Sequence, residues 1–67
     1  MLSARNQFKG KIKSIKLGTV MAEVVVTVGN LDFVAAITRG SVESLKLKEG
    51  DTATIVVKAT EVMVAKD

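Results

Sequence analysis

Apolar residues occupy every second position through most of this chain, and this alternation limits the fold more than any other feature. Four segments show it and a shorter apolar segment follows near the end; they are residues 6–17, 20–28, 31–38, 52–59 and 61–65. An alternation of period two predicts β-strands that bury one face. The sequence therefore predicts an all-β protein with five strands.

Two glycines and a change of parity mark the points where these strands bend or turn. Gly10 stands inside the first predicted strand, where glycine indicates a bend or a close approach of another backbone. Further along this strand the apolar positions change from even numbers, as at Ile12, to odd numbers, as at Ile15. Such a change predicts a β-bulge. Gly29-Asn30 predicts a tight hairpin between the second and third strands.

The alternation is interrupted at residues 40–45, between the third and fourth strands. Ser41 is a good N-cap, and Val42 and Leu45 share one helical face. Three strands, a short helix and two more strands follow the order of an OB-type barrel, whose closure removes exposed strand edges. We predict a five-stranded OB-like barrel with one short helix between strands 3 and 4, formed by a single domain over residues 1–67.

A chain of this size needs a source of stability besides its small core. It has 67 residues with no Cys and no His, which excludes disulfides and a zinc site and leaves oligomerisation. The outer faces of the predicted strands also indicate oligomerisation, because several of their residues are apolar where solvent-facing residues are usually polar. These residues are Met21, Val25, Val34, Ala36, Val56 and Met63.

The chain shows no sign of export or of membrane insertion. Residues 1–8 contain no apolar segment of a secretion signal, and no apolar run approaches the ~20 residues that cross a bilayer. We expect a cytoplasmic protein without a membrane partner.

Positive charge is concentrated in the first third of the sequence. The formal net charge is +3, and residues 1–22 contain no acidic residue. This distribution favours an anionic partner, either a small oxyanion, a nucleic acid or a membrane surface. A solvated lysine face that protects a strand edge is the alternative interpretation. The basic residues are Arg5, Lys9, Lys11, Lys13 and Lys16.

The residue types argue against an enzyme and in favour of anion binding. No His or Cys can act as base or nucleophile, the carboxylates are scattered, and no glycine-rich phosphate loop is present. We therefore expect neither catalysis nor a cofactor. Three segments are instead rich in hydrogen-bond donors: Ser3–Arg5, Thr38–Ser41 and Lys58–Thr60.

An oxyanion with two negative charges offers only acceptors, so its site needs about two positive charges and several neutral donors. Arg5 and Lys58 are the best candidates for the charges. The hydroxyls of Ser3, Thr38, Ser41 and Thr60 and the backbone N–H groups of Ala4 and Ala59 are candidates for the rest. Each residue also has a simpler interpretation: Ser41 as a helix cap, Lys58 as a solvated lysine, and Thr38 and Thr60 as strand formers.

The segment Ser3–Lys11 resembles the opening signature of the molbindin (Mop) family, small molybdate-binding proteins with a TOBE-type OB domain. The resemblance continues through four further segments, Val34–Thr38, Ser41–Val42, Leu47–Asp51 and Val57–Ala65.

The resemblance implies an OB-like barrel that assembles as a hexamer, a trimer of dimers, and binds molybdate or tungstate between subunits. It implies that the contacts come from Ser3, Ala4 and Arg5, from Thr38 and Ser41, and from Lys58, Ala59 and Thr60. Related domains can carry serine after the lysine, whereas Ala59 offers only its backbone N–H. The implied function is storage of the oxyanion in the cytoplasm and molybdenum homeostasis.

Two other functions are compatible with the sequence. OB barrels often bind single-stranded nucleic acid, but such surfaces stack bases on aromatic rings. The aromatic residues here are Phe8 and Phe33, both at predicted core positions, so nucleic acid is not the expected partner. A purely structural assembly module without a ligand is the second alternative.

Overall fold

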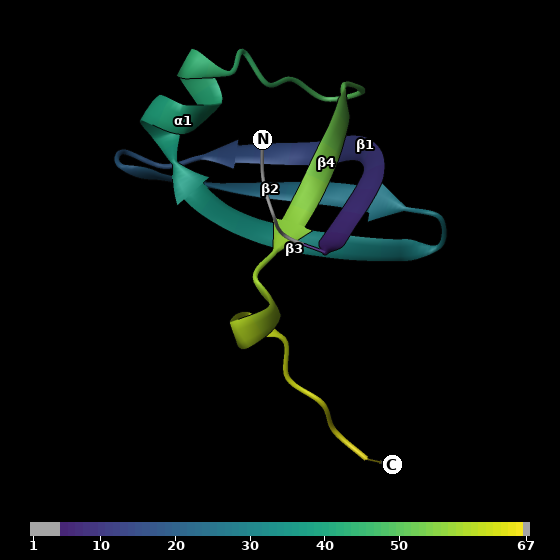
Figure 1. Ribbon diagram of the computed structural model, residues 1–67. Coiled ribbons are helices and arrows are strands. Elements are labelled where there is room, and N and C mark those ends of the chain that lie inside the picture. The colour runs from purple at the N-terminus through teal and green to yellow at the C-terminus, as the bar shows by residue number, and fades with distance from the viewer. Residues whose placement is uncertain (1–4, 67) are drawn as a thin grey trace.

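The computed structural model describes residues 5–66 as a curved antiparallel sheet with one short helix at its end (Figure 1). The sheet has four strands in the order β3-β2-β1-β4, so β3 and β4 are its end strands. No helix in the described range is long and apolar enough to span a bilayer. The elements are β1 (Asn6–Leu17), β2 (Met21–Val28), β3 (Leu31–Thr38), α1 (Arg39–Ser44), β4 (Thr52–Val57) and the 3-10 helix η1 (Ala59–Glu61).

β1 is the longest strand and pairs with two different neighbours. Its first half pairs with β4, from Asn6 opposite Val57, and its second half pairs with β2, as far as Leu17 opposite Ala22. The register with β2 shifts between Ile12 and Ser14, which confirms the predicted bulge. The strand thus turns from one partner to the other and curves the whole sheet.

Gly10 lies where the pairing of β1 changes from β4 to β2. A Cβ placed on Gly10 would overlap the carbonyl oxygen of Thr27 and would lie 2.8 Å from Cγ2 of Val28. The prediction of a close backbone approach at this glycine is therefore confirmed.

The core lies on the concave side of the sheet, and α1 covers one end of it. Alternate residues of β2 are buried, as the period-two pattern predicts, together with one residue of β1 and one of α1. Six further apolar residues pack around them while partly exposed: Ile15, Val28, Ile37, Leu47, Ala53 and Ile55. The buried residues are Ile12, Ala22, Val24, Val26 and Val42.

The helix begins earlier than predicted. α1 starts at Arg39, and its N-cap is Thr38, whose side chain accepts a hydrogen bond from the Ser41 backbone N–H. The prediction of Ser41 as N-cap is wrong. Thr38 and Ser41 are both residue types that cap helices, and Thr38 is the one that ends β3 in an extended conformation.

The all-β, OB-like fold with a helix between the third and fourth strands is confirmed, but the described residues contain four strands rather than five. β4 ends at Val57, and residues 59–61 form η1. The fifth strand was predicted over residues 61–65, but residues 62–66 have no regular secondary structure. A β-strand forms only where its backbone can hydrogen-bond to a neighbouring strand. This segment extends beyond the end of the sheet, so it has no such neighbour among the described residues.

Several apolar side chains lie outside the core of the single chain. Val20 belongs to the bend before β2 and is 69% exposed. Phe8 is 39% exposed, so the prediction of a core position for this residue is wrong. The Phe8 ring stacks on that of Phe33, with 5.3 Å between the ring centroids. Apolar residues on the outer face are also exposed, as predicted; they include Met21, Val34, Ala36 and Val56.

Asp32 forms the clearest ion pair of the described chain and gives a prediction about acid stability. Its carboxylate accepts hydrogen bonds from Thr27 Oγ1 (2.7 Å) and Lys13 Nζ (2.9 Å). These bonds, the one from Thr27 most of all, hold the pKa of Asp32 below its ordinary value of 3.8. A lowered folded-state pKa stabilises the protein above the unfolded-state pKa, and this contribution disappears as the pH falls through the folded-state value.

We expect Asp32→Asn to lower the melting temperature slightly at pH 7, because the charged form of the carboxylate is then lost. The difference from the wild type should shrink between pH 4 and pH 3. Thermal unfolding at pH 7, 4 and 3 measures both effects. A difference that stayed constant over this range would contradict the role of the charged carboxylate.

Candidate functional site

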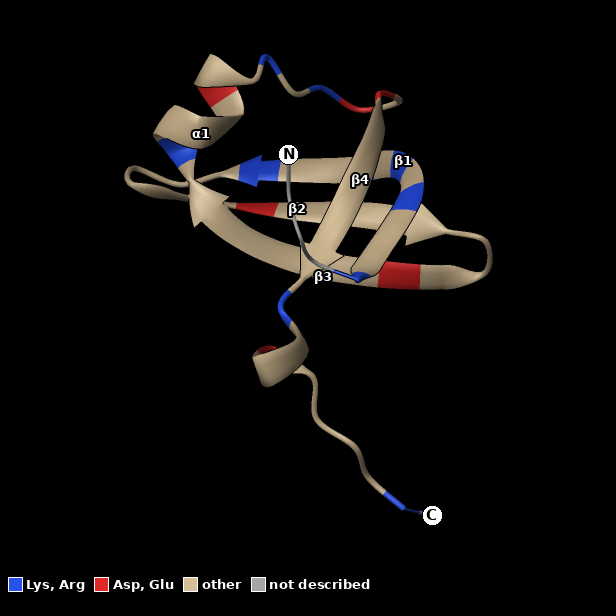
Figure 2. Ribbon diagram, viewed as in Figure 1, with Lys and Arg blue, Asp and Glu red and all other residues tan. Residues whose placement is uncertain are grey.

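The two candidate cations lie side by side at one end of the sheet. Asn6 pairs with Val57 in the β1–β4 ladder, so Arg5 and Lys58 are the next residue on each strand. Both are exposed, and neither forms an ion pair with another residue of the range 5–66. Figure 2 shows basic residues at the start of β1 and directly beyond β4. Two unpaired positive charges are therefore available here to an anion.

The segment after Lys58 adds neutral donors at the same end. Lys58 is the extended residue before η1, and no side chain caps this short helix. Inside η1 the N–H of Glu61 donates to the Lys58 carbonyl at 2.9 Å. The first N–H groups of a helix have no partner within it, so those of Ala59 and Thr60 are free of intrahelical bonds. Ala59 can thus contribute through its backbone, as the sequence predicts.

The central candidates, Thr38 and Ser41, form a hydroxyl pair at the start of α1. Their side-chain oxygens are 2.7 Å apart, and the Ser41 backbone N–H donates to Thr38 Oγ1 at 3.0 Å. Two hydroxyl protons serve one mutual hydrogen bond, so one proton of the pair is left to donate elsewhere. The nearby Arg39 guanidinium instead contacts the Gly18 carbonyl (3.3 Å) and Glu43 (3.9 Å).

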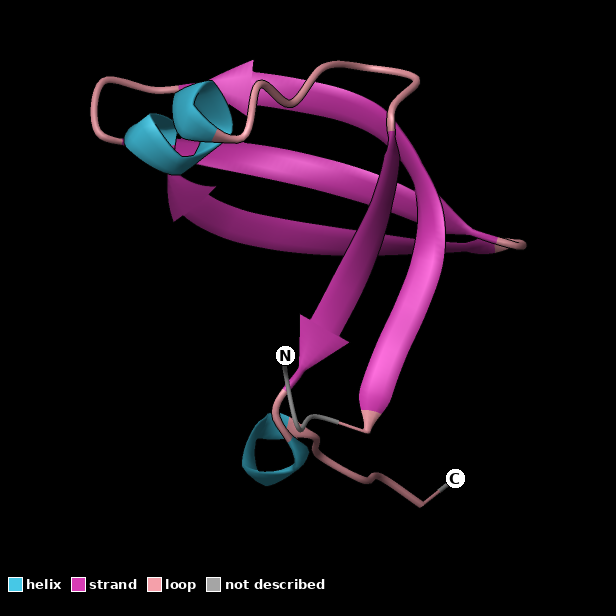
Figure 3. Cartoon of the chain, turned by 45° about the horizontal axis from the view of Figure 1, so that its top comes forward, coloured by secondary structure: helices cyan, strands magenta, loops and turns pink. Residues whose placement is uncertain are grey.

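Within one chain the donors around Arg5 and Lys58 lie far from the hydroxyl pair at the start of α1. Arg5 precedes the first residue of β1, whereas Thr38 pairs with Met21 beside the far end of β1. Twelve strand residues span roughly 40 Å along the backbone. The bend in β1 shortens the direct path, yet Figures 1 and 3 both show the start of α1 far from the end of β4. One small anion cannot touch both groups of the same chain.

Two residues of the predicted anion site cannot be placed in the structure. Ser3 and Ala4 fall outside residues 5–66, so their positions are not described. In the described range, no group of three or more His, Cys, Asp and Glu residues is arranged to hold a metal ion. The chemistry that the described candidates offer is hydrogen-bond donation to an anion.

An apolar groove in the described part of the chain is a surface feature that the sequence did not indicate. It lies between β3 and β4 and has a volume of about 600 Å³. The predicted fifth strand would fill this side of the barrel, so the alternation pattern gave no reason to expect an opening there.

Comparison with known proteins identifies the family. The TOBE domain profile matches residues 2–64. The chain belongs to the TOBE-domain family. Molybdenum-pterin-binding protein 2 of Clostridium pasteurianum is 48% identical to this TOBE domain over 64 residues, which are 94% of each chain. This relationship also confirms the assignment to the molbindin, or Mop, group of small proteins.

Solved structures of molybdate-binding proteins share the same chain fold. A molybdate-binding protein from Sporomusa ovata superimposes with a TM-score of 0.95 at 45% identity, over 98% of both chains. The cytoplasmic molybdate-binding protein ModG, with molybdate bound, gives a TM-score of 0.84 at 40% identity. In that case the match covers 88% of this TOBE domain and 43% of ModG.

Proposed function

We propose that this TOBE-domain protein binds molybdate or tungstate reversibly and serves as a store of the oxyanion in the cytoplasm. It acts by binding, without catalysis, and contributes in this way to molybdenum homeostasis. The observation that carries the proposal is the pair of unpaired cations, Arg5 and Lys58, at the end of the β1–β4 ladder. The molybdate-binding protein from Sporomusa ovata and the molybdenum-pterin-binding protein of Clostridium pasteurianum, which both match over nearly the whole chain, support the choice of ligand.

The ligand is held by hydrogen bonds alone. Arg5 and Lys58 balance the two negative charges, and charged hydrogen bonds of this kind are roughly twice as strong as neutral ones. The remaining donors are Ser3, Thr60 and the backbone N–H groups of Ala4 and Ala59. Because the ligand makes no covalent bond and the site holds no metal ion of its own, binding and release need no other reactant.

The sites lie between subunits. Arg5 and Lys58 are exposed in the single chain, and an anion there stays in contact with water unless a second copy covers it. Thr38 and Ser41 are too far away to join the cations of their own chain, so they contribute to a site formed with another copy. A homo-oligomer can both cover the anion and bring Thr38 and Ser41 of one copy to the cations of another. We propose the hexamer, a trimer of dimers, that the family resemblance implies.

A site built only from donors selects among oxyanions by their protonation state. Phosphate carries a proton at neutral pH, and this proton finds no acceptor in the proposed donor set, which penalises phosphate. Sulfate and molybdate are both unprotonated, so the size of the cavity has to separate them. We expect affinity to fall from molybdate and tungstate to sulfate and phosphate.

Isothermal titration with molybdate, tungstate, sulfate and phosphate tests the function, with the native mass measured before and after. We expect binding of the first two anions, little of the others, and a higher melting temperature with molybdate, because a ligand of the folded state stabilises it. An intact oligomer without any response to molybdate would support an assembly module instead. Salt-dependent binding of a labelled single-stranded oligonucleotide would support the nucleic-acid alternative.

A further inference from the structure

Positive charge continues along β1 from the cation pair Arg5 and Lys58. Lys9 and Lys11 are exposed, and neither forms an ion pair with another residue of the range 5–66. Alternate residues of a strand share one face, so both lysines lie on the face that Arg5 continues. Figure 2 shows basic residues along β1 as well as at its start. A row of cations therefore leads from the middle of β1 to the proposed anion site.

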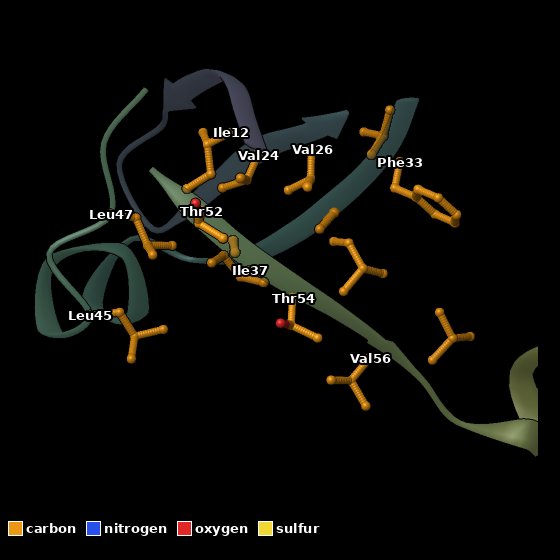
Figure 4. A pocket seen from close by; sticks show the side chains of 15 residues that line it. Ile12, Val24, Val26, Phe33, Ile37, Leu45, Leu47, Thr52, Thr54 and Val56 are labelled. Carbon is orange, nitrogen blue, oxygen red and sulfur yellow. The ribbon is translucent and has the colours of Figure 1, made fainter. Parts of the chain in front are cut away.

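The strand beside this row adds hydroxyl groups and no negative charge. Lys9 pairs with Thr54 and Lys11 pairs with Thr52 in the β1–β4 ladder, and the side chains of paired residues lie on the same face. Neither β1 nor β4 contains an acidic residue. The lysines do not line the apolar groove between β3 and β4 (Figure 4), so they belong to a separate, basic surface.

The carboxylate on the other side of this surface already has a cation of its own. Lys11 is opposite Thr27 on β2, and Thr27 is opposite Asp32 on β3. Asp32 accepts hydrogen bonds from Lys13 Nζ at 2.9 Å and from Thr27 Oγ1 at 2.7 Å. The charge of Lys13 is thus balanced, whereas the charges of Lys9 and Lys11 are available to attract an anion.

We propose that Lys9 and Lys11 form an entry path that draws molybdate to the pair Arg5 and Lys58 by attraction through space, without a direct contact to the bound anion. The inference rests on the proposed function, since it takes this pair as the binding site. At roughly 3.3 Å per residue, Lys9 lies about 13 Å and Lys11 about 20 Å along the strand from Arg5. A surface of one charge sign concentrates ions of the opposite sign and speeds their association.

Charge reversal at two ionic strengths tests the entry path. The variant Lys9→Glu/Lys11→Glu replaces two positive charges of the path by two negative ones. At 10 mM ionic strength the screening length is about 30 Å, so a dianion at the site responds to both changes, and we expect about tenfold weaker molybdate binding than in the wild type. At 300 mM the screening length is about 6 Å, and the difference should be less than about twofold. Calorimetric titration measures the affinities, and the native mass shows whether assembly is unchanged.

Lys13→Glu is the matched control for Lys9→Glu, because it makes the same change of charge on the same strand but farther from the site. At 10 mM ionic strength the affinity should fall about fourfold in Lys9→Glu and about twofold or less in Lys13→Glu. Arg5→Ala removes a proposed contact, so its loss of affinity should remain at 300 mM.

Three results would overturn the entry path while leaving the proposed function intact. The first is equal affinity of the wild type and the variant Lys9→Glu/Lys11→Glu at 10 mM. The second is a loss in this variant that persists at 300 mM, which would mean a direct contact or altered assembly. The third is an equal loss in Lys9→Glu and Lys13→Glu, which would reflect net charge alone. A wild type that does not bind molybdate at either ionic strength would overturn the proposed function, and the entry path with it.

Discussion

Replacement of Gly10 by alanine is expected to destabilise the fold strongly. The added Cβ would overlap the carbonyl oxygen of Thr27 and lie 2.9 Å from its carbonyl carbon. Both atoms belong to the backbone of β2, which its ladders with β1 and β3 hold in place. Because no side-chain rotation relieves the overlap, β1 and β2 have to separate where β1 bends.

The expected loss is large for a chain of this size. Overpacking costs about 1–3 kcal/mol and occasionally more, and we expect about 3 kcal/mol or more here because the obstacle is backbone. A chain of 67 residues has a total stability of roughly 3–10 kcal/mol. The melting temperature should therefore fall by about 12 °C or more, which thermal unfolding followed by circular dichroism measures.

Gly40→Ala is the matched control, because it adds the same methyl group at a glycine that has room for it. Apart from its chain neighbours and the backbone of its own helix, no atom lies within 4 Å of a Cβ placed on Gly40, which belongs to α1. Alanine is favoured over glycine inside a helix by up to about 1 kcal/mol, so this variant should be as stable as the wild type or slightly more so. Both variants are compared at one protein concentration, since assembly affects the melting temperature. Equal melting temperatures for Gly10→Ala and the wild type would contradict the close approach.

Local patterns in the sequence predicted the parts of the fold that depend on neighbouring residues. The parity change after Ile12 located the bulge, Gly10 located the close approach, and Gly29-Asn30 located the hairpin between β2 and β3. Each of these features depends on the direction of alternate side chains or on the special conformations of glycine. Both properties can be read from a few consecutive residues.

Features that depend on distant partners were harder to predict. The apolar pattern of residues 61–65 indicates that this segment can form a strand, but it contains no information on which sheet edge accepts that strand. Ser41 and Thr38 are equally suited to cap a helix, and the end of β3 decides between them. The donor set appeared as three short segments, and the sheet register separates Thr38 from Arg5. Whether a second copy reunites them depends on assembly.

Removal of either candidate cation is expected to weaken molybdate binding more than any other single change in the described chain. A hydrogen bond to a charged group contributes about 1.5–3 kcal/mol. Arg5→Ala and Lys58→Ala should therefore each lower the affinity about tenfold to a hundredfold. The double variant should show no measurable binding. Calorimetric titration with molybdate measures the affinities, and the native mass shows whether assembly is retained.

Lys13→Ala separates a specific contact from the general effect of net charge. It removes one of the ten basic residues, as each test variant does, but Lys13 pairs with Asp32 near the β2–β3 hairpin, away from both groups of candidate donors. Exposed charges separated by more than about 8–10 Å are largely screened at physiological ionic strength, so the affinity of this variant should stay close to that of the wild type. Lys58→Arg keeps the charge and should retain more affinity than Lys58→Ala. If Arg5→Ala and Lys58→Ala bound molybdate as tightly as Lys13→Ala, the cation pair would not be part of the site. The anion would then have to be held by donors elsewhere, with the pair at the end of the β1–β4 ladder serving only as solvated surface charge.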